Sequence, residues 1–181
     1  MKKQLIGALV GGLILFFWQF ISFGPGNLHG SQMDYMPAQE AILKALAENN
    51  VAEGEYFLPR TPMDANSEAQ QKYAEERQIG RPWAQVSYHH QMENTFGFNL
   101  LRGFVIDFLS VFFLIWILMQ MRDLNRKTAL LTSLAVGLIG YMTISYLDGI
   151  WFKSNSIPEL IDTIVQWGLT GAWLGWWLNR N

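Results

Sequence analysis

Residues 100–121 read LLRGFVIDFLSVFFLIWILMQM, an almost unbroken apolar run that contains a single carboxylate, Asp107. An α-helix rises about 1.5 Å per residue, so roughly 20 apolar residues cross the hydrocarbon core of a bilayer, which is about 30 Å thick. Three further apolar runs of similar length lie at residues 5–23, 128–147 and 157–178. The sequence therefore predicts an α-helical polytopic membrane protein with a bundle of four transmembrane helices.

The composition excludes several classes of function. The formal net charge is −2, whereas a nucleic-acid-binding protein needs a clustered basic face, so no nucleic-acid partner is expected. The chain has no cysteine, which excludes disulfides, thiolate nucleophiles and cysteine-based zinc or iron–sulfur sites. It also has no Gly-x-Ser-x-Gly elbow and no His-Glu-x-x-His motif. We expect a protein that is not an enzyme and holds no cofactor.

The basic residues predict the orientation in the membrane. Short segments rich in lysine and arginine stay on the cytoplasmic side, and such residues occur at Lys2, Lys3, Arg122, Arg126, Lys127 and Arg180. Both termini are then cytoplasmic, and residues 24–99 lie in the periplasm of a bacterium. The first run ends without a small-residue cleavage pattern, so we expect it to remain as an anchor rather than to be removed as a signal peptide.

The segment between the first two runs is predicted to fold as a small extracytoplasmic α+β cap, which gives three parts: residues 1–23, 24–99 and 100–181. Apolar residues recur at helical spacing in residues 38–49, and residues 67–78 also have a helical pattern. Residues 54–58 and 83–89 are rich in aromatic and β-branched side chains, which predicts two strands. Because so small a cap has few large apolar residues, we expect it to need the bundle or a partner for stability.

Polar residues within the apolar runs gather near the predicted outer side. The second and fourth runs both descend from that side, which puts Asp107 and Asp162 at similar depth. The predicted layer comprises Asp107, Asp162, Glu159, Gln166, Gln19, Tyr141, Ser145 and Arg102. Glu159, Asp162 and Gln166 recur at intervals of three and four residues, so they share one helix face that points into the bundle.

Two interpretations of this layer remain open. It is either a proton or cation site reached from outside, or a set of interhelical hydrogen bonds that fixes the register of the helices. We favour the second interpretation, because a conducting path needs polar residues across the whole membrane and the inner half supplies almost none.

Small residues and histidines give weaker signals. Gly7, Gly11, Gly171 and Gly175 are spaced by four residues in two of the runs, which predicts close helix packing. The three histidines, His29, His89 and His90, are weak candidates for a metal site, and no metal is expected because neighbouring residues on a strand point to opposite faces. Sensing of periplasmic pH through these histidines is a third alternative.

Several residue combinations resemble those of a known group of proteins. They are Gly11-Gly12 with Trp18 and Ser22, the hexapeptide GEYFLP at residues 54–59, Asp107 with Trp116, and Asp162 with Trp167 and Gly171. The chain resembles small, uncharacterised bacterial inner-membrane proteins with an N-terminal anchor, a short periplasmic insert and three further transmembrane helices. Members carry a Trp-His pair where this chain has Leu28-His29. The resemblance implies this topology and no particular activity.

The sequence as a whole favours a non-catalytic integral membrane protein that serves as an accessory or assembly subunit of a larger membrane complex. Its expected partners are the lipid bilayer and either another membrane protein or a second copy of the chain. The alternative is a small transporter, or a proton- or cation-coupled membrane protein, that uses the carboxylate layer.

Overall fold

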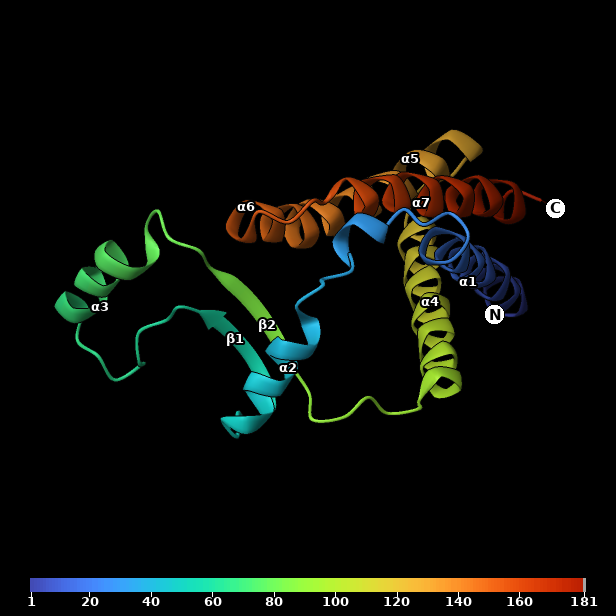
Figure 1. The fold of residues 1–181 in the computed structure, drawn as a ribbon. Coiled ribbons are helices and arrows are strands. Elements are labelled where there is room, and N and C mark those ends of the chain that lie inside the picture. Colours follow the sequence, from blue (N-terminus) through green and yellow to red (C-terminus); the bar gives the residue numbers. More distant parts are fainter. Residues whose placement is uncertain (181) are drawn as a thin grey trace. The chain divides into compact units, whose positions relative to one another are not determined.

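The computed structural model describes residues 1–180, which form two compact units (Figure 1). One unit, here called the helical unit, comprises Met1–Tyr35 and, among the described residues, 95–180. The other, the insert unit, comprises Met36–Asn94. Residues 24–35, which the sequence analysis assigns to the cap, therefore belong to the helical unit.

Long helices make up nearly all of the helical unit. They are α1 (Lys2–Phe23), α4 (Phe96–Met119), α5 (Arg126–Tyr141), α6 (Leu147–Phe152) and α7 (Ile157–Leu178). A π-helical segment, Met142–Tyr146, joins α5 to α6 without a break, and the short 3-10 helix Gly30–Gln32 follows α1. Helix α1 packs against both α4 and α7, and α5 packs along α7 (Figure 1). Local capping agrees with these bounds, because Asn125 accepts a hydrogen bond from the Thr128 amide at the start of α5.

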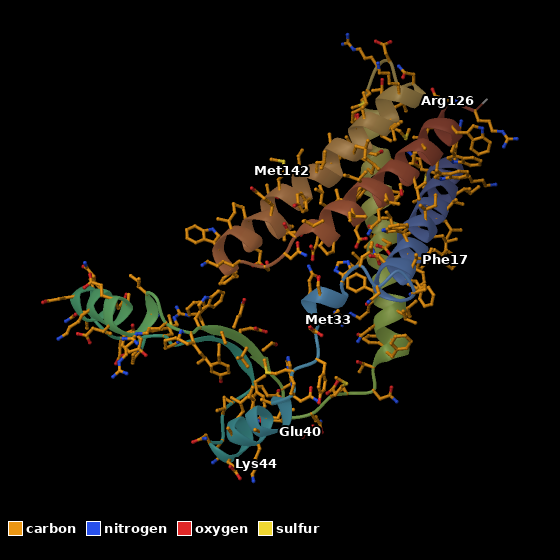
Figure 2. The ribbon with its side chains drawn as sticks, turned by 45° about the horizontal axis from the view of Figure 1, so that its top comes forward. Phe17, Met33, Glu40, Lys44, Arg126 and Met142 are labelled. Atoms are coloured by element: carbon orange, nitrogen blue, oxygen red, sulfur yellow. The ribbon has the colours of Figure 1, made fainter. Side chains whose placement is uncertain are left out.

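Three helices are long and apolar enough to cross a membrane: Lys2–Phe23, Phe96–Met119 and the continuous helix Arg126–Phe152. Helix α7 is as long as α1, with 22 residues, but it carries Glu159, Asp162, Gln166 and four tryptophans and is not among these three. The fourth predicted span therefore stays a prediction. Side chains such as Phe17 and Met142 project from the outer surfaces of the helices, where a bilayer can accommodate them (Figure 2).

The core of the helical unit is apolar and closely packed. It is made of Ala8, Leu15, Val111, Leu114, Ile115, Leu118, Ala129 and Leu174, each at most 2 % exposed. Lipid tails are as apolar as leucine, so helices in a bilayer associate through close packing and interhelical hydrogen bonds rather than through the hydrophobic effect. The stability of this unit therefore depends on how closely its helices pack against one another.

Glycines permit the closest helix contacts. A Cβ atom on Gly171 of α7 would lie 2.7 Å from the Ser133 Cβ and 3.0 Å from the Leu130 Cα on α5. One on Gly12 of α1 would lie 3.0 Å from the backbone of Phe108 on α4. The four glycines of the sequence analysis also face neighbouring helices: Gly7 and Gly11 lie against residues of α4 and α7, and Gly171 and Gly175 lie against residues of α5.

The insert unit contains two helices and a two-stranded sheet. Its elements are α2 (Gln39–Glu48), β1 (Gly54–Leu58), α3 (Ser67–Tyr73), the π-helical segment Ala74–Gln78, and β2 (Ala84–Tyr88). The strands pair antiparallel, with Gly54 opposite Tyr88 and Leu58 opposite Ala84. These positions agree with the predicted strands. Tyr88 is the one buried residue among Met36–Asn94, so this unit has almost no core of its own.

The contact at Gly171 gives a test of the packing. We expect Gly171→Ala to lower the free energy of unfolding by about 1–3 kcal/mol, because the new methyl group meets the backbone of α5. Gly103→Ala in α4 is the matched control, since no atom of another helix lies within 4 Å of its Cβ position. Thermal unfolding in detergent, followed by tryptophan fluorescence, compares the two variants. Equal stability of both would contradict this account.

Candidate functional site

Residues 24–32 fold back over the end of α1 and are here called the His29 loop. The amide of Gly26 donates to the Ile21 carbonyl at 2.7 Å, and the amide of Leu28 donates to the Ser22 carbonyl at 3.0 Å. These bonds place the imidazole of His29 flat on the ring of Phe23, with the ring centroids 3.9 Å apart. The loop thus carries His29 to the end of the bundle, where its side chain is buried.

The carboxylate of Asp162 is the centre of the hydrogen-bond network. Its Oδ1 accepts bonds from Trp18 Nε1 at 2.9 Å and from Ser22 Oγ at 2.6 Å. Its Oδ2 lies 2.8 Å from His29 Nε2. Both carboxylate oxygens are therefore paired, and one side chain of α7 holds α1 and the His29 loop together.

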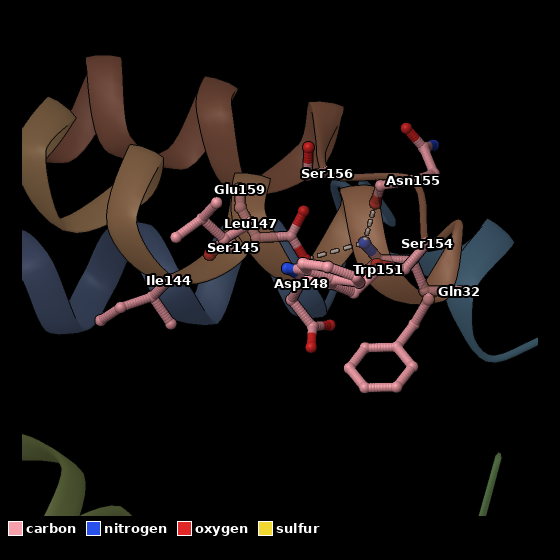
Figure 3. A pocket seen from close by; sticks show the side chains of 11 residues that line it. Gln32, Ile144, Ser145, Leu147, Asp148, Trp151, Ser154, Asn155, Ser156 and Glu159 are labelled. Atoms are coloured by element: carbon pink, nitrogen blue, oxygen red, sulfur yellow. Dashed lines mark hydrogen bonds between the residues drawn. The ribbon is translucent and has the colours of Figure 1, made fainter. Parts of the chain in front are cut away.

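Gln32 links the same histidine to Glu159. The Gln32 Nε2 donates to the Glu159 Oε1 at 2.7 Å and to the Asn155 carbonyl at 2.6 Å (Figure 3). The Gln32 Oε1 lies 2.7 Å from His29 Nδ1. Because the two acceptors fix the orientation of the amide, both ring nitrogens of His29 face acceptor oxygens. Only the doubly protonated imidazolium can donate to both of them.

The electrostatic environment agrees with a protonated His29. Burial of the ring lowers its pKa, but the hydrogen bonds to Asp162 and Gln32 and the charges of Asp162 and Glu159 outweigh this effect and raise the pKa above the ordinary value of 6.5. A raised pKa in the folded state means that protonation favours folding. This stabilisation is fully present below about pH 6.5 and is lost as the pH rises through the raised pKa of His29.

A second buried carboxylate, Asp107 on α4, is bound by Gln19, the residue next to Trp18. Its Oδ1 accepts a bond from Gln19 Nε2 at 3.0 Å. Its Oδ2 is buried and has no hydrogen-bond partner among the described residues. Adjacent residues of α1 thus reach carboxylates on two different helices, and no hydrogen bond within residues 1–180 joins Asp107 to Asp162 directly.

The structure brings together only part of the predicted polar layer. Glu159 joins the network through Gln32, and Ser145 lines a neighbouring cavity. The Tyr141 hydroxyl pairs with Ser156, at 3.0 Å, and the Arg102 guanidinium lies over the Phe98 ring. Gln166 is half-buried on α7, and its side chain forms no hydrogen bond within residues 1–180.

The contacts that four members of the site make were missed by sequence reasoning: Trp18, Ser22, His29 and Gln32. The sequence shows a histidine soon after an apolar run, but it does not show that the chain reverses there. The Gly24-Pro25-Gly26 break is the one available signal for that reversal.

The other two histidines have separate surroundings in the insert unit. His90 lies near Glu53, with its Nδ1 3.6 Å from the carboxylate, and His89 lies 3.4 Å from the Ser87 hydroxyl. Within residues 1–180, no three histidine, cysteine or acidic side chains are arranged to hold a metal ion.

A cavity of about 600 Å³ opens beside the network (Figure 3). Gln32 and Glu159 form part of its wall, and further lining residues come from the end of the α5–α6 helix and the connection to α7: Ile144, Ser145, Leu147, Asp148, Trp151, Phe152, Ser154, Asn155 and Ser156. The cavity thus shares three residues with the hydrogen-bond network: Gln32, Asn155 and Glu159.

No family model, curated protein or solved structure matches this chain.

The network predicts a specific loss of stability. We expect Ser22→Ala to lower the free energy of unfolding by about 1.5–3 kcal/mol, because the buried Ser22 hydroxyl donates to the charged Asp162. Ser133→Ala is the matched control: its hydroxyl is equally buried but bonds only the carbonyl of Ala129 in its own helix. Chemical denaturation in detergent compares the two, and an equal effect would show that the bond to Asp162 has no special role.

Proposed function

We propose that the chain is a non-catalytic integral membrane protein that acts as an accessory or assembly subunit of a larger membrane complex. The observation that carries this proposal is the complete pairing of Asp162 within the chain. A carboxylate whose two oxygens both accept hydrogen bonds from neighbouring elements fixes helix register, and a transported ion would have to displace those bonds. The closely packed apolar core of Leu114, Leu118 and Leu174 also supports a role without a conducting path.

The proposed topology has four membrane spans, with both termini in the cytoplasm and the insert unit as a cap in the periplasm of a bacterial inner membrane. The contact between the first and last helices supports an even number of crossings. The Trp177 Nε1 donates to the Lys3 carbonyl at 2.7 Å, and the Lys3 Nζ donates to the Leu178 carbonyl at 3.1 Å. The start of α1 and the end of α7 thus lie side by side.

Cysteine labelling tests this topology, because the natural chain contains no cysteine. We expect Ser31→Cys in intact cells to react with a membrane-impermeant maleimide. Asp123→Cys, in the connection between α4 and α5, should react only after the membrane is permeabilised. Both positions are exposed in the structure. Reaction of both, or of neither, in intact cells would contradict the proposed orientation.

The insert unit supports the accessory role. A unit of this size with one buried residue gains little free energy from its own core, and association with a partner is one of the usual remedies. Apolar side chains of α2 remain exposed, among them Ile42 and Leu43. They offer a surface on which another protein can bury apolar area.

Co-purification tests the proposed role. We expect the protein, captured from native membranes in mild detergent through a C-terminal tag, to bring down a partner at fixed stoichiometry. Leu43→Asp should reduce the recovery of that partner by tenfold or more, since a charge on this face costs at least about 1.4 kcal/mol of binding free energy. Met92→Asp is the control, because Met92 is fully exposed outside the helices and strands. Recovery of a lone monomer would overturn the proposal.

A specific observation favours the alternative, a proton- or cation-coupled transporter. Asp107 Oδ2 and Glu159 Oε2 are both buried without a hydrogen-bond partner among the described residues, which is uncommon in a folded protein. These oxygens are the free acceptors that an ion or proton would use.

Flux measurements in liposomes separate the two functions. If the protein is a transporter, Asp107→Asn and Asp162→Asn abolish a pH-dependent flux and leave the amount of folded protein unchanged. If it is an accessory subunit, the unaltered protein gives no flux above empty liposomes, and Asp162→Asn lowers its thermal stability. Asp148→Asn is the control for a carboxylate outside the network, because Asp148 is exposed.

A further inference from the structure

We propose that the His29 loop is a proton-operated latch, in which protonated His29 holds residues 24–32 against α7 and loss of its proton releases Gln32 from Glu159. The first argument is the direction of the hydrogen bonds. Gln32 must present its nitrogen to Glu159 and Asn155, because carboxylate and carbonyl oxygens only accept. Its oxygen is thereby committed to His29, and the imidazolium is the donor at that end of the chain of bonds.

A neutral imidazole cannot complete this arrangement. If its one N–H points to Asp162, the lone pair of Nδ1 faces the Gln32 Oε1 at 2.7 Å. If the proton sits on Nδ1, the lone pair of Nε2 faces the Asp162 Oδ2 at 2.8 Å. Turning the Gln32 amide over moves the conflict to Glu159, where two oxygens would then meet. Each arrangement leaves two acceptors in contact, so the neutral state favours separation of the loop from α7.

The charges around the loop also favour its separation from α7 when His29 loses its proton. The titratable groups that face His29 are Asp162 and Glu159, both from α7. Helix α1 contributes Trp18, Ser22 and Phe23, which carry no charge. Among the described residues no lysine or arginine pairs with either carboxylate, so the proton on His29 supplies the positive charge of the network. Its loss leaves two carboxylates at the end of α7 without a cation.

Release of the loop changes the neighbouring cavity. Gln32 forms part of the cavity wall together with Glu159, and its side chain spans from the loop to the start of α7 (Figure 3). When Gln32 leaves, the carboxylate of Glu159 faces the cavity that Asp148 and Trp151 also line. The latch therefore couples the protonation of one buried histidine to the shape and charge of this cavity. This inference does not depend on the accessory role.

The test observes the proton and the loop separately in the full-length protein in nanodiscs. Histidine labelled with ¹³C at Cε1 gives three resonances, of which His89 and His90 are exposed references. Spin labels at Ser31→Cys and Arg122→Cys, which are both exposed positions of the helical unit, report the position of the loop. We expect the spin-label distance distribution to be narrow below pH 6.5 and to broaden with the same midpoint as the titration of His29.

Variants show whether His29 drives the movement. We expect His29→Gln to remove the pH dependence of the spin-label distance and His89→Gln to leave it unchanged. Asp162→Asn should lower the midpoint pH of the transition strongly, because the Asp162 Oδ2 lies 2.8 Å from His29 Nε2. Glu159→Gln should lower it less, because the Glu159 Oε1 lies 3.7 Å from His29 Nδ1. If Asp162→Asn does not fold, Glu159→Gln still tests the shift. The proposal is overturned if His29 titrates while the loop stays in place, or if the transition persists in His29→Gln.

Discussion

A buried carboxylate at one end of an apolar bundle imposes the main constraint on this structure. Taking a carboxylate out of water is costly unless neighbouring groups compensate with hydrogen bonds or an opposite charge. The compensation for Asp162 comes from three directions: a tryptophan and a serine of α1, and a histidine that follows α1. Helix α1 must therefore lie against α7 in one register, and the chain beyond α1 must turn back.

Close packing along the rest of the bundle depends on that register. Helix α1 also meets α4, where Gly12 lies against the backbone of Phe108 and Gln19 reaches Asp107. A shift of α1 by one residue would remove the glycine from this contact and turn Gln19 and Trp18 away from their carboxylates. The polar contacts near one end and the glycine contacts along the helices thus specify the same arrangement. Contacts that support one another in this way favour a single folded state.

Much of the fold could be predicted from sequence, because the signals are local. The apolar runs and the two strands appear close to their predicted positions, although α4 begins at Phe96, before the predicted run. The candidate site was harder to predict. Asp107 and Asp162 stand out as charges in apolar runs, but helix rotation, which packing sets, decides which partners they meet. The role of His29 depends on a chain reversal of nine residues, 24–32, which no periodicity in the sequence reports.

The place of the His29 loop in the chain links the site to the insert unit. The loop ends at Gln32 and the insert unit begins at Met36, so only a few residues separate the latch from that unit. While Gln32 is bound to Glu159 and Asn155, this connection starts from a fixed point on α7. After release of the loop, the flexible connection to the insert unit starts at the end of α1. Residues 24–32 then add to the length of this connection. A longer flexible tether lowers the effective concentration of a domain at any one position. Protonation of His29 therefore acts on the insert unit through the length of its tether.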